Sequence, residues 1–151
     1  MARKGSPKTD LFTKMNQLDF YQQAPPKSLG REWFIGMLLP LMDSSTLSPE
    51  DLMATAVEHI AFQVARGISE AGLKSVLVTG GGALNLSLMK RIAHNTTASI
   101  KIPEAQLIHY KEALVFALLG VLKIRGEINC LSSVTGGKRD LSAGTIHKTK
   151  S

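Results

Sequence analysis

One helix that is apolar on nearly every face constrains this chain more than any other feature. Residues 111–124 read Lys-Glu-Ala-Leu-Val-Phe-Ala-Leu-Leu-Gly-Val-Leu-Lys-Ile, and residues 113–122 are all apolar or glycine. Such a helix is typical of the middle of a protein, where neighbouring elements cover all of its sides. The apolar run is shorter than the roughly 18 residues that mark a membrane span, so we expect no membrane partner.

Strands and helices alternate through the middle of the chain. We predict a short buried strand over residues 73–79, a helix over 83–93 and a second strand over 98–103, before the apolar helix 111–124. This order favours a parallel α/β arrangement. Two strands cannot bury so apolar a helix on their own. We therefore expect partner strands from another chain or from sequence upstream.

The helix predicted over residues 48–68 begins with clear signals. Ser48 can cap it, Pro49 suits its first position, and two acids follow. We expect one apolar face, made of Leu52, Met53, Val57, Ile60, Ala61, Val64 and Ile68. A shorter helix is predicted over residues 10–19, and the proline pair 25–26 should end it.

Basic residues give the chain a formal net charge of +6, and they gather at its two ends. Aromatic residues make up 5% of the sequence, too few for a base-stacking platform. We therefore expect a flexible basic N-terminus over residues 1–9, a folded lobe over 10–137 and a basic tail over 138–151. The alternative function is that of a small nucleic-acid-binding protein. Such a protein would bind DNA or RNA in a salt-sensitive way, and this binding would survive removal of both tails.

The cysteine and histidine content points to neither disulfides nor metal. The single cysteine, Cys130, excludes an internal disulfide framework and suits a reducing cytosol. No apolar segment follows the N-terminus, so we expect no signal peptide and a cytoplasmic location. The four histidines have no partners at metal-ligand spacing: His59, His94, His109 and His147. We expect His59 to be a hydrogen-bonded structural residue.

A glycine triplet, Gly80, Gly81 and Gly82, separates the first strand from the helix that contains Asn85. Glycines there let backbone or a flat ligand approach without meeting a Cβ. Ligands of open α/β sheets bind outside the carboxyl ends of the strands, where this turn would lie. The triplet matches neither the dinucleotide fingerprint nor the phosphate-binding loop. A tight turn without any ligand is the equal alternative.

Glu112 is the second candidate site residue. We expect it near the N-terminus of the apolar helix, where a negative charge is favoured. Its carboxylate could accept hydrogen bonds from a hydroxylated ligand, or it could simply cap its own helix.

Three stretches of the chain share one family pattern. They are Pro-Pro-Lys-Ser-Leu-Gly-Arg-Glu at 25–32, Val-Thr-Gly-Gly-Gly-Ala-Leu-Asn at 78–85, and Glu-Ala-Leu-Val-Phe at 112–116 followed by Asn129 and Ser-Val-Thr-Gly at 133–136. Together they resemble the anhydro-N-acetylmuramic acid kinase family. The first stretch is specific for that family, and the glycine triplet is shared more widely among actin-like and sugar-kinase ATPases.

The resemblance implies an enzyme of cell-wall recycling that uses ATP and Mg²⁺. The family phosphorylates 1,6-anhydro-N-acetylmuramic acid while it opens the anhydro ring with water. The implied fold is α/β, part of an actin-like (ribonuclease-H-like) ATPase domain with an incomplete sheet and packed helices. The family pattern puts Gly80, Gly81, Gly82 and Asn85 in the adenosine-side wall and turns Glu112 toward the sugar. It gives no separate roles to Lys27, Ser28, Gly30, Arg31 and Glu32.

The chain also departs from the family pattern. Family members are more than twice as long, and this chain resembles only their C-terminal part. The phosphate-binding glycine loop and the Asp-Thr-Gly segment with the general base are absent, so the resemblance places no catalytic residue here. His109 stands where many relatives carry an acid. Phosphoryl transfer depends on positioning and electrostatics, so we expect no activity from the chain alone.

Two kinds of partner remain open besides the amino sugar and ATP. One is the missing N-terminal half, and the other is a second copy, because subunits of the family often pair. The alternative function is a non-catalytic binding module, or a split subunit that completes its fold with a separate N-terminal chain.

Overall fold

The structure is a computed structural model that describes residues 2–24 and 27–147. Pro25 and Pro26, predicted to end the first helix, lie outside the described residues, as does the end of the predicted basic tail. The chain divides into two compact units, Met1–Pro103 and Glu104–Ser151. Each unit is described by itself.

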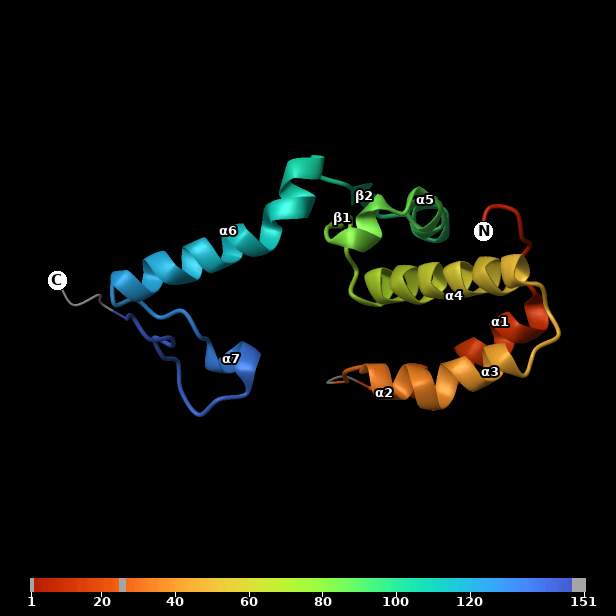
Figure 1. Cartoon of the computed structure of the whole chain (residues 1–151), viewed down its shortest axis with the longest axis horizontal. Coiled ribbons are helices and arrows are strands. Elements are labelled where there is room, and N and C mark those ends of the chain that lie inside the picture. Colours follow the sequence, from red (N-terminus) through yellow and green to blue (C-terminus); the bar gives the residue numbers. More distant parts are fainter. Residues whose placement is uncertain (1, 25–26, 148–151) are drawn as a thin grey trace. The chain divides into compact units, whose positions relative to one another are not determined.

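The first unit is mostly helical and contains a small sheet (Figure 1). Its elements are α1 (Thr9–Asn16), η1 (Asp19–Tyr21), α2 (Arg31–Trp33), η2 (Phe34–Leu38), α3 (Leu39–Asp43), α4 (Pro49–Glu70), β1 (Ser75–Leu77), η3 (Gly81–Leu84), α5 (Leu86–Asn95) and β2 (Ser99–Lys101). The second unit contains α6 (Ala105–Ile124) and α7 (Ser132–Thr135).

Helix α4 begins as predicted. The Asp51 N–H donates to Ser48 Oγ (3.2 Å), which makes Ser48 the N-cap, and Pro49 is the first helical residue. The predicted apolar face is wrong in part, because Met53, Ile60 and Val64 are exposed. The buried side chains of α4 are Ala54, Thr55, Val57, His59, Ala61, Ala65 and Ile68.

The buried face of α4 differs from the prediction because the helix serves two cores. On one side, Ala61 and Ile68 pack with Met89 and Ile92 of α5 and with Ala98. On another side, α4 meets a cluster built on α1 and η2, which contains Leu11, Met15 and Leu38. Figure 1 shows α4 between these two layers, with α5 and the strands on one side and α1 and α3 on the other.

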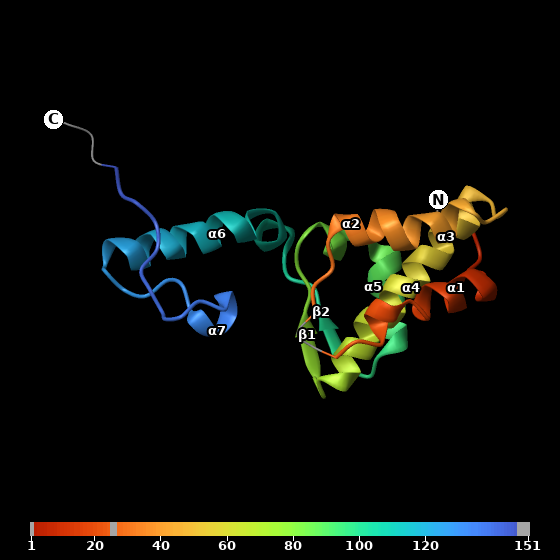
Figure 2. The same ribbon diagram turned by 90° about the horizontal axis from the view of Figure 1, so that it is seen from below.

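The strands β1 and β2 pair in parallel, with Val76 opposite Ile100 (Figure 2). The predicted parallel α/β order is therefore confirmed. The expectation of a buried strand over residues 73–79 is wrong, because Ser75 and Leu77 are exposed and only Val76 is half-buried. Among the described residues no third strand pairs with this sheet.

The segment before α1 is held against the start of α4. The Ser6 N–H donates to Asp51 Oδ1 (2.8 Å), and the Lys8 N–H donates to Thr55 Oγ1 (3.0 Å). The Ser6 hydrogen bond, together with the nearby Lys8 ammonium, lowers the pKa of Asp51. A Cβ on Gly5 would lie 2.0 Å from the Glu50 carbonyl oxygen, so this close approach requires glycine. The three-part division predicted from charge stays a prediction.

In the second unit, helix α6 is longer than predicted. It begins at Ala105 instead of residue 111 and runs to Ile124. Ile108 is the only buried residue of α6 among those that the structure describes, so the second unit by itself does not cover the helix, and the expected partner strands stay a prediction. Within the second unit, the segment after the helix folds back on it. None of the helices in the described ranges is long and apolar enough to cross a membrane.

That returning segment is fixed by Asn129. Its side-chain N–H₂ donates to the carbonyl oxygens of Leu119 (3.3 Å) and Ala143 (3.2 Å), and its Oδ1 accepts from the Ala143 N–H (2.7 Å). Cys130 and Leu141 form an antiparallel bridge beside it. Residues 141–143 are thereby tied to α6 and to residues 129–130.

Candidate functional site

The glycine triplet forms the turn that leads from β1 into η3. Gly80 has φ +82° and ψ 176°, a backbone conformation that side chains other than glycine's essentially never adopt. The turn closes on itself through hydrogen bonds from the Ala83 N–H to the Gly80 carbonyl (3.0 Å) and from the Asn85 N–H to the Gly82 carbonyl (3.1 Å). Gly80 is therefore required by the backbone itself.

Gly81 and Gly82 are not required by the fold of the described chain. Both are exposed, neither has positive φ, and a Cβ on either would meet nothing within 4 Å. They leave a strip of bare backbone on the surface, at the carboxyl end of β1. Such a strip admits a flat ligand or another backbone at closer range than any side chain would allow.

Asn85 caps the helix that follows. The Leu88 N–H donates to Asn85 Oδ1 (3.1 Å), so α5 begins at Leu86 and ends at Asn95. The predicted helix over 83–93 is corrected accordingly, because residues 81–84 form a 3₁₀ turn before the cap. Just before the triplet, the buried Thr79 Oγ1 has no hydrogen-bond partner among the described residues.

Glu112 lies in the third turn of α6 and is exposed. The expectation that it opens the helix is wrong, because residues 105–111 are already helical. It therefore does not benefit from the positive end of the helix dipole, which acts only within the first turn. The candidate residues fall into two groups: Gly80, Gly81, Gly82 and Asn85 share one turn of the first unit, and Glu112 belongs to the second unit.

The segment with Lys27 and Arg31 lies beside an aromatic cluster. Lys27 Nζ donates to the Phe20 carbonyl (3.0 Å) and lies 4.9 Å from the centre of the Phe20 ring. Gly30 precedes the first turn of α2, and Arg31 and Glu32 are exposed within that turn. The described contacts give Lys27 a structural partner and leave Arg31 and Glu32 at the surface.

His59 is a satisfied structural residue, as expected. Asn16 Nδ2 donates to the Phe12 carbonyl (2.7 Å), so Asn16 Oδ1 is left to accept from Gln63 Nε2 (2.7 Å) and from His59 Nδ1 (2.9 Å). His59 Nε2 then accepts from the Tyr21 hydroxyl (2.9 Å). Burial lowers the pKa of His59 to about 4 and raises the pKa of Tyr21.

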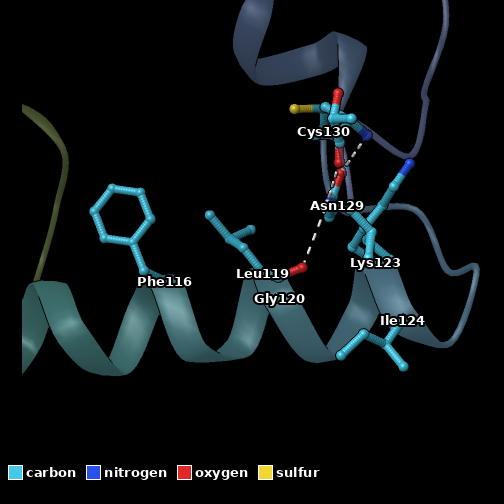
Figure 3. Close-up of a pocket in the computed structure, with 11 residues that line it drawn as sticks. Phe116, Leu119, Gly120, Lys123, Ile124, Asn129 and Cys130 are labelled. Carbon is cyan, nitrogen blue, oxygen red and sulfur yellow. Dashed lines mark hydrogen bonds between the residues drawn. The ribbon is translucent and has the colours of Figure 1, made fainter. Parts of the chain in front are cut away.

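A hollow of about 510 Å³ lies in the second unit, between α6 and the returning segment. Figure 3 shows Phe116, Leu119 and Lys123 of α6 on one side, with Asn129 and Cys130 opposite. The lining is mostly apolar, and Lys123 Nζ donates to the Ser142 carbonyl (3.0 Å). Sequence reasoning missed this hollow. Its one signal in the sequence is Asn129, which belongs to the family pattern.

Comparisons with known proteins match a single family along nearly the whole chain. The family model for anhydro-N-acetylmuramic acid kinase matches residues 1–149. Relatives with that name from Gloeothece citriformis and Mannheimia succiniciproducens are each 34% identical, over 97% and 96% of this chain. A relative with the same name from Salinibacter ruber is 32% identical over 96%.

The same matches cover only part of each relative. The chain spans 40% of the Gloeothece protein, 42% of the Mannheimia protein and 40% of the Salinibacter protein, consistent with a C-terminal portion. This agrees with the expectation that family members are more than twice as long. The family match and the three relatives support one conclusion: the chain belongs to the anhydro-N-acetylmuramic acid kinase family.

Proposed function

We propose that this chain supplies the adenosine-side wall, and part of the sugar-side wall, of an ATP-dependent kinase acting on 1,6-anhydro-N-acetylmuramic acid. The enzyme would transfer the γ-phosphoryl group of ATP to the sugar while water opens the anhydro ring, in the cytoplasm, as a step of cell-wall recycling. The fold would be one lobe of an actin-like ATPase. The family match supports the reaction class.

The observation that carries the proposal is the bare backbone at Gly81 and Gly82. Neither conformation nor packing within the described chain requires glycine there, although both positions carry it. A ligand that packs flat against the turn explains why both positions are glycine. The base of an adenosine is flat enough to pack in this way. Asn85 then contributes by fixing the start of α5, which holds the turn in place.

Glu112 would serve the sugar side. Its exposed carboxylate can accept hydrogen bonds from sugar hydroxyls, and an ionised acceptor makes these stronger than bonds between neutral groups. The Asp-Thr-Gly segment and the phosphate-binding glycine loop of the family pattern do not occur in these 151 residues. Because positioning of the phosphates supplies most of the catalysis, we propose that this chain alone does not transfer phosphate.

The described part of the chain holds no group of three or more His, Cys, Asp or Glu side chains that could bind a metal ion. The Mg²⁺ that accompanies ATP is held in kinase sites largely by substrate phosphates, waters and one or two carboxylates. We therefore assign it no ligand in this chain and derive no step through the ion.

Calorimetric titration of ATP–Mg²⁺ into the purified chain tests the nucleotide wall, with circular dichroism to show that each variant is folded. We expect saturable binding that is lost in Gly81→Asp, which places a charged side chain on the bare strip. The matched control is Gly36→Asp, because Gly36 is also exposed and a Cβ there also meets nothing within 4 Å. Absence of binding in the folded chain, or equal binding by Gly81→Asp, would contradict the proposal.

A further inference from the structure

A hollow of about 430 Å³ in the first unit is lined mainly by basic side chains, and we call it the basic hollow. The second unit contributes nothing to its lining. Its volume lies within the range of small-molecule sites, roughly 300–1,000 Å³. Three cations, one histidine, one hydroxyl and one carboxylate surround it: Arg3, Lys90, Arg91, His94, Ser87 and Glu58. The basic hollow thus combines the size of a ligand site with an excess of positive charge.

Three segments of the first unit form the basic hollow. Four of its side chains, at positions 87, 90, 91 and 94, share one face of α5 because they are three or four residues apart along the helix. Glu58 comes from α4, and Arg3 comes from the segment before α1. Two backbone hydrogen bonds to side chains of α4 hold that segment in place, and Figure 1 shows the start of the chain beside α5.

The single carboxylate does not balance these cations. Arg91 donates to Glu58 Oε2, and Asn95 Nδ2 donates to Glu58 Oε1 (3.2 Å), so both oxygens of this carboxylate have partners within the chain. Neither Arg3 nor Lys90 forms an ion pair with a carboxylate in the part of the chain that the structure describes. Two uncompensated positive charges therefore line the basic hollow, and an anion between them would replace their repulsion with attraction.

We propose that the basic hollow binds a small phosphate-bearing anion, of which pyrophosphate is the simplest probe. The planar guanidinium of Arg3 matches the oxygens of a phosphate, and the ammonium of Lys90 supplies a second charge. The Ser87 hydroxyl and the His94 ring add neutral donors. A phosphate group offers three acceptor oxygens to these donors, whereas a carboxylate offers two. The glycine turn does not line the basic hollow, so this site does not depend on the proposed kinase function.

Calorimetric titration of pyrophosphate into the full chain at constant ionic strength tests the proposal, with circular dichroism to show that each variant is folded. We expect saturable binding that weakens at least roughly tenfold in Lys90→Gln and in Arg3→Gln, because each variant removes a charged hydrogen-bond donor. The matched control is Lys101→Gln, which removes the same charge from β2, outside the lining of the basic hollow, and should bind normally.

Gly81→Asp should also bind pyrophosphate normally, which separates this proposal from the nucleotide wall. Loss of binding in Gly81→Asp would place pyrophosphate at the glycine turn and would overturn the proposal. Absence of binding by the folded, unaltered chain would do the same, as would equal weakening in Lys101→Gln, which would show an effect of net charge alone. Equal or tighter binding of citrate, or tighter binding of a short DNA duplex, would make a carboxylate or a nucleic acid the occupant and would also overturn it.

Discussion

The buried His59 should make the free energy of unfolding of the first unit depend on pH between about 4 and 6.5. Few other side chains titrate in this range. His59 is 2% exposed, and burial lowers its pKa from 6.5 to about 4. Between these values the unfolded chain binds a proton on His59 that the folded chain does not bind. Stability therefore rises with pH across the window and is lost as the pH falls.

The size of the effect follows from the two pKa values. Lowering the pH from about 7 to about 5 should cost about 2 kcal/mol, and the full difference below about pH 4 is roughly 3 kcal/mol. The lowered pKa values of Asp51 and Asp140 do not interfere, because their contributions are lost only below the usual carboxylate range. The window from about pH 5 to about pH 7 thus isolates the histidine.

Urea unfolding followed by circular dichroism, repeated across this window, measures the effect. The variant His59→Gln should be less stable near neutral pH, because it loses buried hydrogen bonds, and its stability should change little with pH. The matched variant His94→Gln, at an exposed position, should keep the slope of the unaltered chain. A flat profile in the unaltered chain, or the same slope in His59→Gln, would refute the reasoning.

Three further predictions concern backbone and caps. Gly80→Ala should cost about 1–3 kcal/mol of unfolding free energy, because its φ of +82° suits only glycine, whereas Gly82→Ala should change it by less than about 0.5 kcal/mol; urea unfolding of the two variants checks the contrast. Asn85→Ala should cost about 1 kcal/mol through the lost N-cap, measured in the same way, and equal stability would show that the cap is idle. The pKa of Asp140, lowered by hydrogen bonds from the Ser132 hydroxyl and backbone N–H, should rise in Ser132→Ala when followed by NMR titration; no rise would exclude the hydroxyl as a cause.

The sequence predicted correctly those helices and strands that depend on residues close together along the chain. Ser48 and Pro49 gave the start of α4, and the alternation of strand and helix gave the parallel pair of strands. The predicted start of α6 is wrong, although Pro103 followed by Glu104 is a signal that a strand ends and a helix can begin. The family pattern puts Asn85 in the nucleotide wall, but asparagine before a helical pattern is also a common N-cap.

Contacts between residues that lie far apart along the chain could not be predicted from the sequence. His59 was expected to be satisfied, but its partners Asn16 and Tyr21 lie 43 and 38 residues away. The two-sided packing of α4 was missed for the same reason, because a single apolar face was the simplest interpretation of its pattern. For the candidate site, the sequence identified the glycine turn, and only the structure separated the glycine that the backbone needs from the two that it does not.

The most direct test of the account measures phosphoryl transfer to the sugar. The full chain, alone and in complex with the unmatched portion of the Gloeothece citriformis relative, would be incubated with ATP–Mg²⁺ and 1,6-anhydro-N-acetylmuramic acid. Mass spectrometry would detect the ring-opened phosphorylated product. The account predicts product from the complex, much less with Glu112→Gln, and none from the chain alone. Product from the chain alone, or none from a complex that binds both substrates, would contradict it.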